Sequence, residues 1–296
     1  KDEMIVTVGG SEAIDLAIRA IIESGDEVLV VEPSYVSYAP ITELTGGVAV
    51  PLPTRAEDKF KLTPELLKKH ITPKTKMLVL PYPNNPTGAI MTAEELQRIA
   101  DVLCNTDIVV LTDEIYGELT YGRKRTSFAS MPSMWDRTIF VGGFSKTYAM
   151  TGWRLGYVCA PKEITKQMLK IHQYCIMCAP TMSQYAGIKA ACDGDADYMR
   201  EHYDQRRKLL LKGLDDIGLE CFEPEGAFYV FPNIGKYGLT SEEFCEKLLY
   251  AKHCAIVPGT AFGASGEGFA RISYAYSVDH ICKALERMEA FLKEIR

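Results

Sequence analysis

Short apolar runs alternate with helical stretches over the first half of the chain, and this alternation constrains the fold more than any other feature. The runs lie at residues 4–8, 27–31, 77–80, 108–112, 138–141 and 155–159. Helix-start signals fall between them, such as Thr63-Pro64-Glu65 and the capping-box sequence Thr92-Ala93-Glu94-Glu95. Strands that alternate with helices form a doubly wound, largely parallel sheet, which binds ligands at the carboxyl ends of its strands. The sequence therefore predicts an α/β fold.

The pattern changes in the second half of the chain. It turns helical from residue 162, and residues 195–216 read as one long charged helix. Beyond this helix we expect short strands at 219–222, 228–231, 254–257 and 271–274, mixed with helices at 241–252 and 278–295. This mixed order predicts a large domain over residues 1–205 and a smaller C-terminal α+β domain over residues 206–296.

Composition excludes several classes of function. The net charge is −6, and basic residues cluster no further than short stretches such as 123–125 and 205–208, which argues against a nucleic-acid partner. No apolar run approaches the ~18 residues of a membrane span, and no signal-peptide pattern occurs, so we expect a cytoplasmic protein without a membrane partner. The nine scattered cysteines are typical of reduced thiols, and the five histidines are too far apart to predict a metal site.

One lysine stands in an unusual setting. Lys146 follows the apolar run at 138–141 and lies among Gly143, Ser145 and Thr147 rather than among other charges. A lysine at the end of a buried strand, close to a second cation such as Arg154, is expected to have a lowered pKa. Its neutral amine could then form a Schiff base with an aldehyde.

Other motifs are ambiguous when each is taken alone. Gly9-Gly10-Ser11-Glu12 joins a strand to a helix, which suits anion binding but also an ordinary turn. Asn85-Pro86-Thr87-Gly88 could be only a turn, because each of its residue types favours one. Likewise Asp113 could cap a helix, Tyr116 could be a core aromatic, and Arg271 could be a surface cation.

The joint order of these motifs resembles the class I/II aminotransferases, a family of fold type I enzymes that depend on pyridoxal 5'-phosphate (PLP). The order is a glycine turn, an aromatic residue, Asn-Pro-Thr-Gly, Asp-x-x-Tyr, Ser-Lys, Arg and a distal Arg, and the resemblance covers essentially the whole chain. It implies an aminotransferase that moves an amino group from an L-amino acid to a 2-oxo acid by a ping-pong mechanism. It also implies PLP as cofactor and a homodimer.

The resemblance implies a role for each motif. Lys146 would hold PLP as a Schiff base and then act as the catalytic base, Asp113 would face the pyridine nitrogen, and Tyr116 and Asn85 would contact the phenolic oxygen. Tyr35 would stack on the ring, and Arg271 would bind the substrate α-carboxylate, with Asn85 as a second substrate-binding residue. The residues implied at the cofactor phosphate are Gly10, Ser11, Ser145 and Arg154, and Glu12 is implied among the cofactor-binding residues.

Two departures from the family pattern bear on these expectations. The family carries a segment before the point where this sequence begins, so we expect a fragment that lacks the N-terminal part of the small domain. Aspartate-type members carry a further arginine in the region that corresponds to residues 172–178, and none occurs there. The amino donor could therefore be neutral, aromatic or acidic.

Two alternatives remain open at this stage. A PLP-dependent C–S β-lyase would share the fold and the lysine. A transcription regulator could use an aminotransferase-like domain to sense PLP, although the full set of catalytic residues disfavours this reading.

Overall fold

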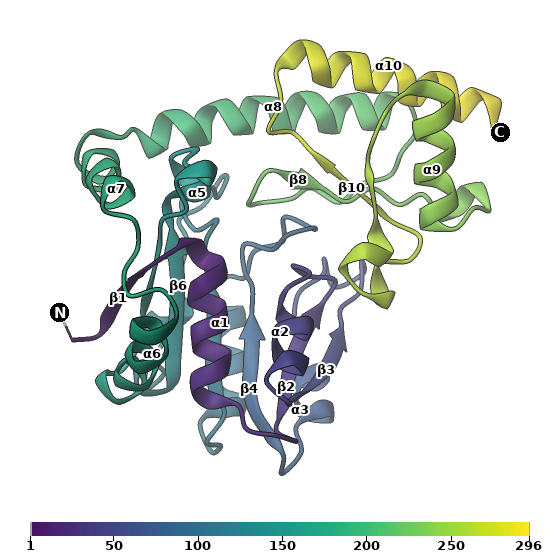
Figure 1. Ribbon diagram of the computed structural model, residues 1–296. Helices are drawn as coiled ribbons and strands as arrows, with labels where there is room; N and C mark the ends of the chain where they lie inside the picture. Colours follow the sequence, from purple (N-terminus) through teal and green to yellow (C-terminus); the bar gives the residue numbers. More distant parts are fainter. Residues whose placement is uncertain (1, 296) are drawn as a thin grey trace.

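The computed structural model describes residues 2–295, and a seven-stranded sheet forms its centre (Figure 1). The strand order is β1-β7-β6-β5-β4-β2-β3. Neighbouring strands from β3 to β6 run parallel, whereas β7 is antiparallel to both β6 and β1. The predicted α/β fold with a mostly parallel sheet is confirmed. The strands are β1 (Met4–Thr7), β2 (Glu27–Glu32), β3 (Val48–Pro53), β4 (Thr75–Leu80), β5 (Val109–Asp113), β6 (Thr138–Gly143) and β7 (Gly156–Cys159).

Helices cover both faces of this sheet because its central strands are apolar on both sides. In β2, Val28 and Val30 pack with α1 (Gly9–Ile21), α2 (Tyr38–Leu44) and α6 (Lys162–Cys175). The alternate residues Leu29 and Val31 pack on the opposite face with α3 (Pro64–His70) and α4 (Ala93–Leu103). Successive side chains of a strand point to opposite faces, so one continuous apolar run supplies two cores.

The sequence pattern does not predict strand β3. It contains Pro51 and Pro53, which lack the N–H that a central strand needs. The structure places β3 at the edge of the sheet, where only β2 pairs with it. An edge strand tolerates proline because one side of its backbone has no ladder partner.

The long helix expected at 195–216 is confirmed as α8 (Ala196–Asp216), which Asp195 caps through a hydrogen bond from the Tyr198 N–H. The chain reaches it through α5 (Phe144–Thr147) and α7 (Thr181–Asp193). In Figure 1, α8 runs above the large sheet toward the C-terminal elements. Its 21 residues correspond to a length of about 32 Å.

A second, three-stranded sheet follows α8. It contains β8 (Tyr229–Val230), β9 (Val257–Pro258) and β10 (Ala270–Ser273) in the order β8-β10-β9, with both pairs antiparallel. Helices α9 (Ser241–Lys252) and α10 (Val278–Glu294) share an apolar core with this sheet and α8. The short 3-10 helices are Phe128–Ser130, Trp135–Arg137, Thr151–Trp153, Gly235–Tyr237, Gly259–Phe262 and Ala264–Gly266.

The strand predicted at 219–222 is wrong. Leu219 buries its side chain, and the Glu220 carbonyl accepts one bond from the Asn233 N–H, but the segment forms no ladder. Its apolar residues are buried along an irregular chain path, which periodicity cannot separate from a short strand.

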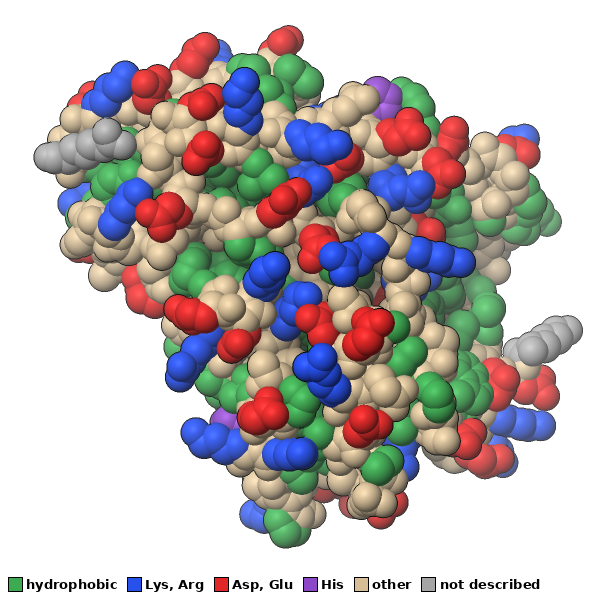
Figure 2. Space-filling model, turned by 180° about the vertical axis from the view of Figure 1, so that it is seen from behind, with side chains coloured by type: hydrophobic (Ala, Val, Ile, Leu, Met, Phe, Trp, Pro, Cys, Tyr) green, Lys and Arg blue, Asp and Glu red, His purple; other side chains and the backbone are tan. Residues whose placement is uncertain are grey.

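The surface carries both signs of charge. Lys and Arg side chains alternate with Asp and Glu over the face shown in Figure 2. Within residues 2–295, no helix combines the length and apolar character needed to cross a membrane. The outermost residues of the expected domain limits, Lys1 and Arg296, lie outside the described residues.

Candidate active site

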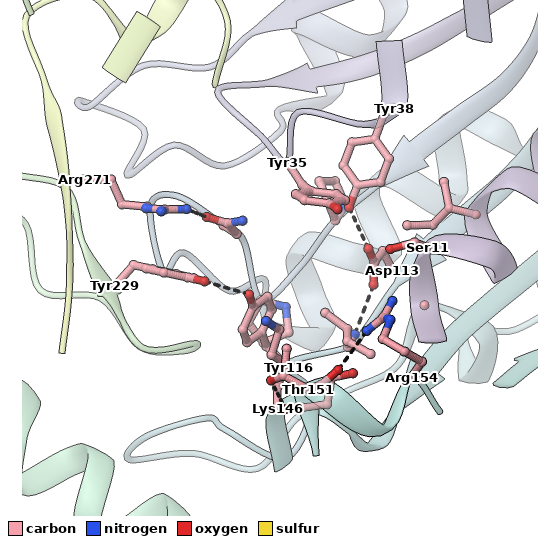
Figure 3. A pocket seen from close by; sticks show the side chains of 17 residues that line it. Ser11, Tyr35, Tyr38, Asp113, Tyr116, Lys146, Thr151, Arg154, Tyr229 and Arg271 are labelled. Carbon is pink, nitrogen blue, oxygen red and sulfur yellow. Dashed lines mark hydrogen bonds between the residues drawn. The ribbon is translucent and has the colours of Figure 1, made fainter. Parts of the chain in front are cut away.

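A cavity of about 340 Å³ lies where the carboxyl ends of β5 and β6 meet the second sheet (Figure 3). The sequence-predicted site residues, with the exception of Glu12, all line it. The complete lining is Gly10, Ser11, Ile14, Tyr35, Tyr38, Pro81, Pro83, Asn85, Asp113, Ile115, Tyr116, Ser145, Lys146, Thr151, Arg154, Tyr229 and Arg271.

Lys146 reaches this cavity because α5 begins directly after β6. Its Nζ lies 5.7 Å from the ring centroid of Tyr116 and 5.6 Å from that of Phe228. Burial lowers the pKa of Lys146, the positive charges of Arg154 and Arg271 lower it further, and Asp113 opposes them. The lowered pKa agrees with the sequence prediction, but burial contributes more to it than Arg154 does. A neutral amine is thereby favoured in the cavity.

Asp113 ends β5 and is only 6% exposed. Its Oδ2 accepts a hydrogen bond of 2.7 Å from the Tyr38 hydroxyl, and its Oδ1 accepts one of 3.1 Å from the Ile115 N–H. Burial raises the pKa of Asp113, while these two bonds and the charge of Lys146 lower it. The two donors fix the orientation of the carboxylate in the cavity.

The sequence pattern predicts Tyr38 only as part of a helix start and carries no sign of a role in the site. It lies three positions after Tyr35, and the two rings meet edge to face with centroids 5.7 Å apart. Only the tertiary structure brings its hydroxyl to Asp113, 75 positions further along the chain.

The first turn of α1 forms one end of the cavity together with Arg154. Gly9 has a φ of +74°, and a Cβ built on it would lie 2.5 Å from a terminal nitrogen of Arg154. A side chain at position 9 would therefore displace the guanidinium, which also donates a 3.0 Å bond to the Thr151 carbonyl. Gly10 and Ser11 line the cavity beside this guanidinium. Helix N–H groups together with a guanidinium make a strong anion site.

Glu12, expected among the cofactor-binding residues, does not line the cavity. One carboxylate oxygen accepts a hydrogen bond from the Val8 N–H, and the other accepts a bond of 2.7 Å from Nδ1 of His172 in α6. Both oxygens are therefore engaged outside the cavity. The sequence could not show this, because His172 is 160 positions away.

The Asn-Pro-Thr-Gly motif is both a turn and a part of the site. Asn84 Oδ1 accepts hydrogen bonds from the Thr87 N–H and hydroxyl, and Gly88 has a φ of +73°. A Cβ on Gly88 would lie 2.4 Å from Pro224, so the turn requires glycine. The turn directs Asn85 into the cavity.

Asn85 meets Arg271 across the cavity. Arg271 donates a bond of 2.9 Å from Nη1 to Asn85 Oδ1, and its guanidinium lies between the rings of Tyr229 and Phe262, at 4.6 and 4.7 Å. The Nε of Arg271 is buried without a hydrogen-bond partner. Buried donors normally have partners, so this orphan marks a place for an acceptor such as a carboxylate.

Tyr116 is tied to the same side of the cavity. Its hydroxyl lies 3.0 Å from that of Tyr229, and either group could donate the bond. Burial raises the pKa of both tyrosines, so both hydroxyls stay protonated at neutral pH. The sequence pattern predicts Tyr229 only as part of a strand.

The donor set fits PLP, which combines an aldehyde, a ring nitrogen, a phenolic oxygen and a phosphate. Lys146 offers an amine of lowered pKa, and Asp113 offers a fixed carboxylate. The space that Gly9 leaves for Arg154 supplies an anion cradle. Within the described residues, no group of three or more His, Cys, Asp or Glu side chains is placed to hold a metal ion.

Comparisons with known proteins agree with this geometry. The family model described as aminotransferase class I and II matches residues 1–288. An aspartate aminotransferase of Pyrococcus abyssi is 45% identical over 99% of this chain and 76% of its own length. An aromatic-amino-acid aminotransferase of Thermococcus litoralis is 42% identical over 99% of this chain and 77% of its own length.

The solved structures agree as well. The crystal structure of an aromatic aminotransferase from Pyrococcus horikoshii superposes with a TM-score of 0.96 at 45% identity, covering 99% of this chain and 80% of the other. An aspartate aminotransferase from Thermus thermophilus with maleate gives a TM-score of 0.93 at 39% identity over 98% and 76%. Sequence, fold and cavity lead to one assignment: the chain belongs to the class I and II aminotransferases, which depend on PLP.

Proposed function

We propose that this aminotransferase moves the amino group of an L-amino acid to a 2-oxo acid in two half-reactions at the cavity, with Lys146 carrying the proton. The observation that carries the proposal is the placement of a partly buried amine of lowered pKa and an arginine with an unpaired Nε in one cavity. The amine supplies a base, and the arginine supplies a site for the carboxylate that amino acids and 2-oxo acids share.

The residues that would hold the cofactor divide by its parts. Lys146 would bind its aldehyde carbon, Asp113 its ring nitrogen, and Tyr116 with Asn85 its phenolic oxygen, while Tyr35 would pack against the ring. Gly10, Ser11, Ser145 and Arg154 would hold its phosphate. PLP, when bound, supplies a carbon that takes up the amino group and a ring that delocalises the negative charge left on Cα.

The protein moves the proton. Arg271 would fix the substrate α-carboxylate through Nε and a terminal nitrogen, which sets the orientation of Cα. Lys146 Nζ would take the proton from the substrate Cα and hold it in the cavity until it is returned. Burial lowers the pKa of Nζ, which favours the neutral form that can accept this proton.

The range of amino donors is part of the proposal. Relatives carry the names of aspartate and aromatic-amino-acid aminotransferases. Residues 172–178 contain no arginine for a second carboxylate. We infer that the donor is neutral, aromatic or acidic, and that Arg271 and Asn85 recognise the part that these donors share.

A second copy of this chain is the proposed partner. Large apolar side chains lie exposed along the end of α6, the following turn and α7, and contiguous surfaces of this kind mark contact sites between proteins. They are Tyr174, Ile176, Met177, Met182, Tyr185 and Ile188, exposed between 43% and 91%.

The proposed division into a large domain and a small domain falls within α8, which packs against α5 at one end and α10 further along.

A single-turnover experiment tests the function. With PLP and an amino acid but no oxo acid, we expect at most one equivalent of 2-oxo acid per subunit, followed by resumed turnover when a second oxo acid is added. Lys146→Ala should abolish both phases. Continuous release of pyruvate and ammonia would show a lyase, and PLP binding without any half-reaction would favour a sensor. Either result would overturn the proposal.

A further inference from the structure

Glu12 and His172 form a buried pair that the proposed reaction does not use. His172 Nδ1 lies 2.7 Å from Glu12 Oε1, and the His172 side chain is 5% exposed against 11% for Glu12. Because a carboxylate oxygen can only accept, Nδ1 must carry the hydrogen in this bond. The pair joins the first turn of α1 to the last turn of α6, two helices that pack side by side.

The second oxygen of Glu12 reaches the backbone at the start of α1. It accepts the hydrogen bond of the Val8 N–H, directly before Gly9, whose carbonyl accepts a bond of 2.9 Å from the Thr7 hydroxyl. Gly9 has a left-handed backbone conformation, and glycine can adopt several others as readily. Its backbone therefore needs restraint from its surroundings. Glu12 supplies part of it and is itself held by His172.

The charge of Glu12 gives its placement a second consequence. Gly10 and Ser11 line the cavity, and Glu12 follows them directly but does not. A carboxylate free to turn toward the anion site would repel a bound phosphate. The hydrogen bond from His172 holds the carboxylate against α6 instead, while its charge still favours the helix N-terminus.

We propose that Glu12 and His172 are a positioning pair for the anion site. They hold the turn from Gly9 to Ser11 with its N–H groups toward the cavity, and they keep the Glu12 carboxylate away from the anion. Neither side chain touches the bound group. The inference rests on the proposed function in one respect, because it takes the anion to be the phosphate of PLP.

The test compares binding of PLP with binding of pyridoxal, which lacks the phosphate, by absorbance titration of the complete chain. His172→Leu should weaken PLP binding about tenfold, the equivalent of one charge-assisted hydrogen bond, and should change pyridoxal binding less than about twofold. His172→Gln should recover most of the loss, since its amide N–H can donate to the same carboxylate. Glu12→Ala combined with His172→Leu should be no worse than Glu12→Ala alone.

Asp15 and Arg19 supply a matched control, because they form an exposed ion pair of 2.8 Å on the same helix. Asp15→Ala should leave the ratio of the two affinities unchanged. Equal weakening of PLP and pyridoxal by His172→Leu, or no weakening of either, would overturn the positioning role.

If His172→Leu does not fold, Glu12→Gln gives the same readout at constant side-chain size, with a loss confined to PLP expected and an equal loss contradicting the inference. A wild-type protein that binds PLP no better than pyridoxal would overturn the anion site itself, and with it the proposed function. If the wild type prefers PLP over pyridoxal and every variant keeps the same preference, only the positioning role of Glu12 and His172 is overturned.

Discussion

The two sides of the cavity are built differently. On the strand-end side, Asp113 ends β5 and Lys146 follows β6. Arg154 precedes β7, which begins at the same edge of the sheet because it runs antiparallel to β6. The arginine side, made by Arg271, Tyr229 and Asn85, depends on contacts between segments far apart in sequence, such as the Asn85–Arg271 bond across 186 positions.

The two sides differ in whether their polar groups already have hydrogen-bond partners. On the strand-end side both Asp113 oxygens have donors and the Arg154 guanidinium has a partner. On the arginine side the Nε of Arg271 has none. We therefore expect the strand-end side to hold a resident group, and the arginine side to bind a group that enters and leaves. Mutations on the two sides should therefore separate the rate of the chemical step from substrate affinity.

The largest effect should come from the strand-end side. Asp113→Asn removes the charge that we propose faces the ring nitrogen while keeping the side-chain size, and kcat should fall about 10²- to 10³-fold with KM changed much less. Steady-state kinetics at saturating PLP measures this. A change in KM alone would break the proposed division between the two sides.

On the arginine side, Arg271→Ala should raise KM for the amino acid about 10- to 100-fold, the effect of losing a charge-assisted pair of hydrogen bonds. Arg271→Lys should recover little of it, because an ammonium lacks the planar fork. Amines without a carboxylate should react equally with the variant and the wild type. If they react more slowly with Arg271→Ala, Arg271 contributes to the chemical step.

A smaller effect should follow from Tyr38→Phe, which removes one of the two donors to Asp113. We expect kcat to fall about three- to tenfold, as for one hydrogen bond to a charged group. In an Asp113→Asn background the same change should cost much less, because the charge that strengthens the bond is gone. Equal losses in both backgrounds would show that Tyr38 acts through packing.

The smallest effect concerns stability without cofactor. The folded state lowers the pKa of Lys146 from 10.5, so the unfolded chain binds its proton more readily. The charged lysine therefore costs stability at neutral pH, and this cost declines as the pH rises toward the unfolded pKa. Lys146→Met should melt at a higher temperature than the wild type at pH 7, with a gap that narrows toward pH 10. A difference in melting temperature that stays constant or widens toward pH 10 would contradict the lowered pKa of Lys146.

The strand-end side could be predicted from the sequence because its residues are tied to local pattern. Lys146 and Asp113 directly follow or end apolar runs, and parallel strands bring their carboxyl ends to one edge of a sheet. The capping box at Thr92 and the cap of α8 at Asp195 are equally local, and the structure confirms both helix starts.

Residues that act through distant partners could not be predicted in this way. The sequence pattern predicts Tyr38 and Tyr229 only as parts of a helix start and a strand, and it gives no sign that Glu12 contacts His172. Likewise, the two prolines of β3 argue against a strand, and only its position at the edge of the sheet allows them. The segment expected as a strand at 219–222 forms no ladder with another strand.

The sequence by itself determined the alternation of strands and helices, and with it the edge of the sheet at which Lys146 and Asp113 stand. Strand period, caps and turns depend on neighbours a few positions away, so they are written in local pattern. Tertiary structure alone decided which hydroxyl holds Asp113, which amide contacts Arg271, and where the carboxylate of Glu12 turns. Those outcomes depend on distances between residues 75 to 186 positions apart, which the packing of helices and sheets sets.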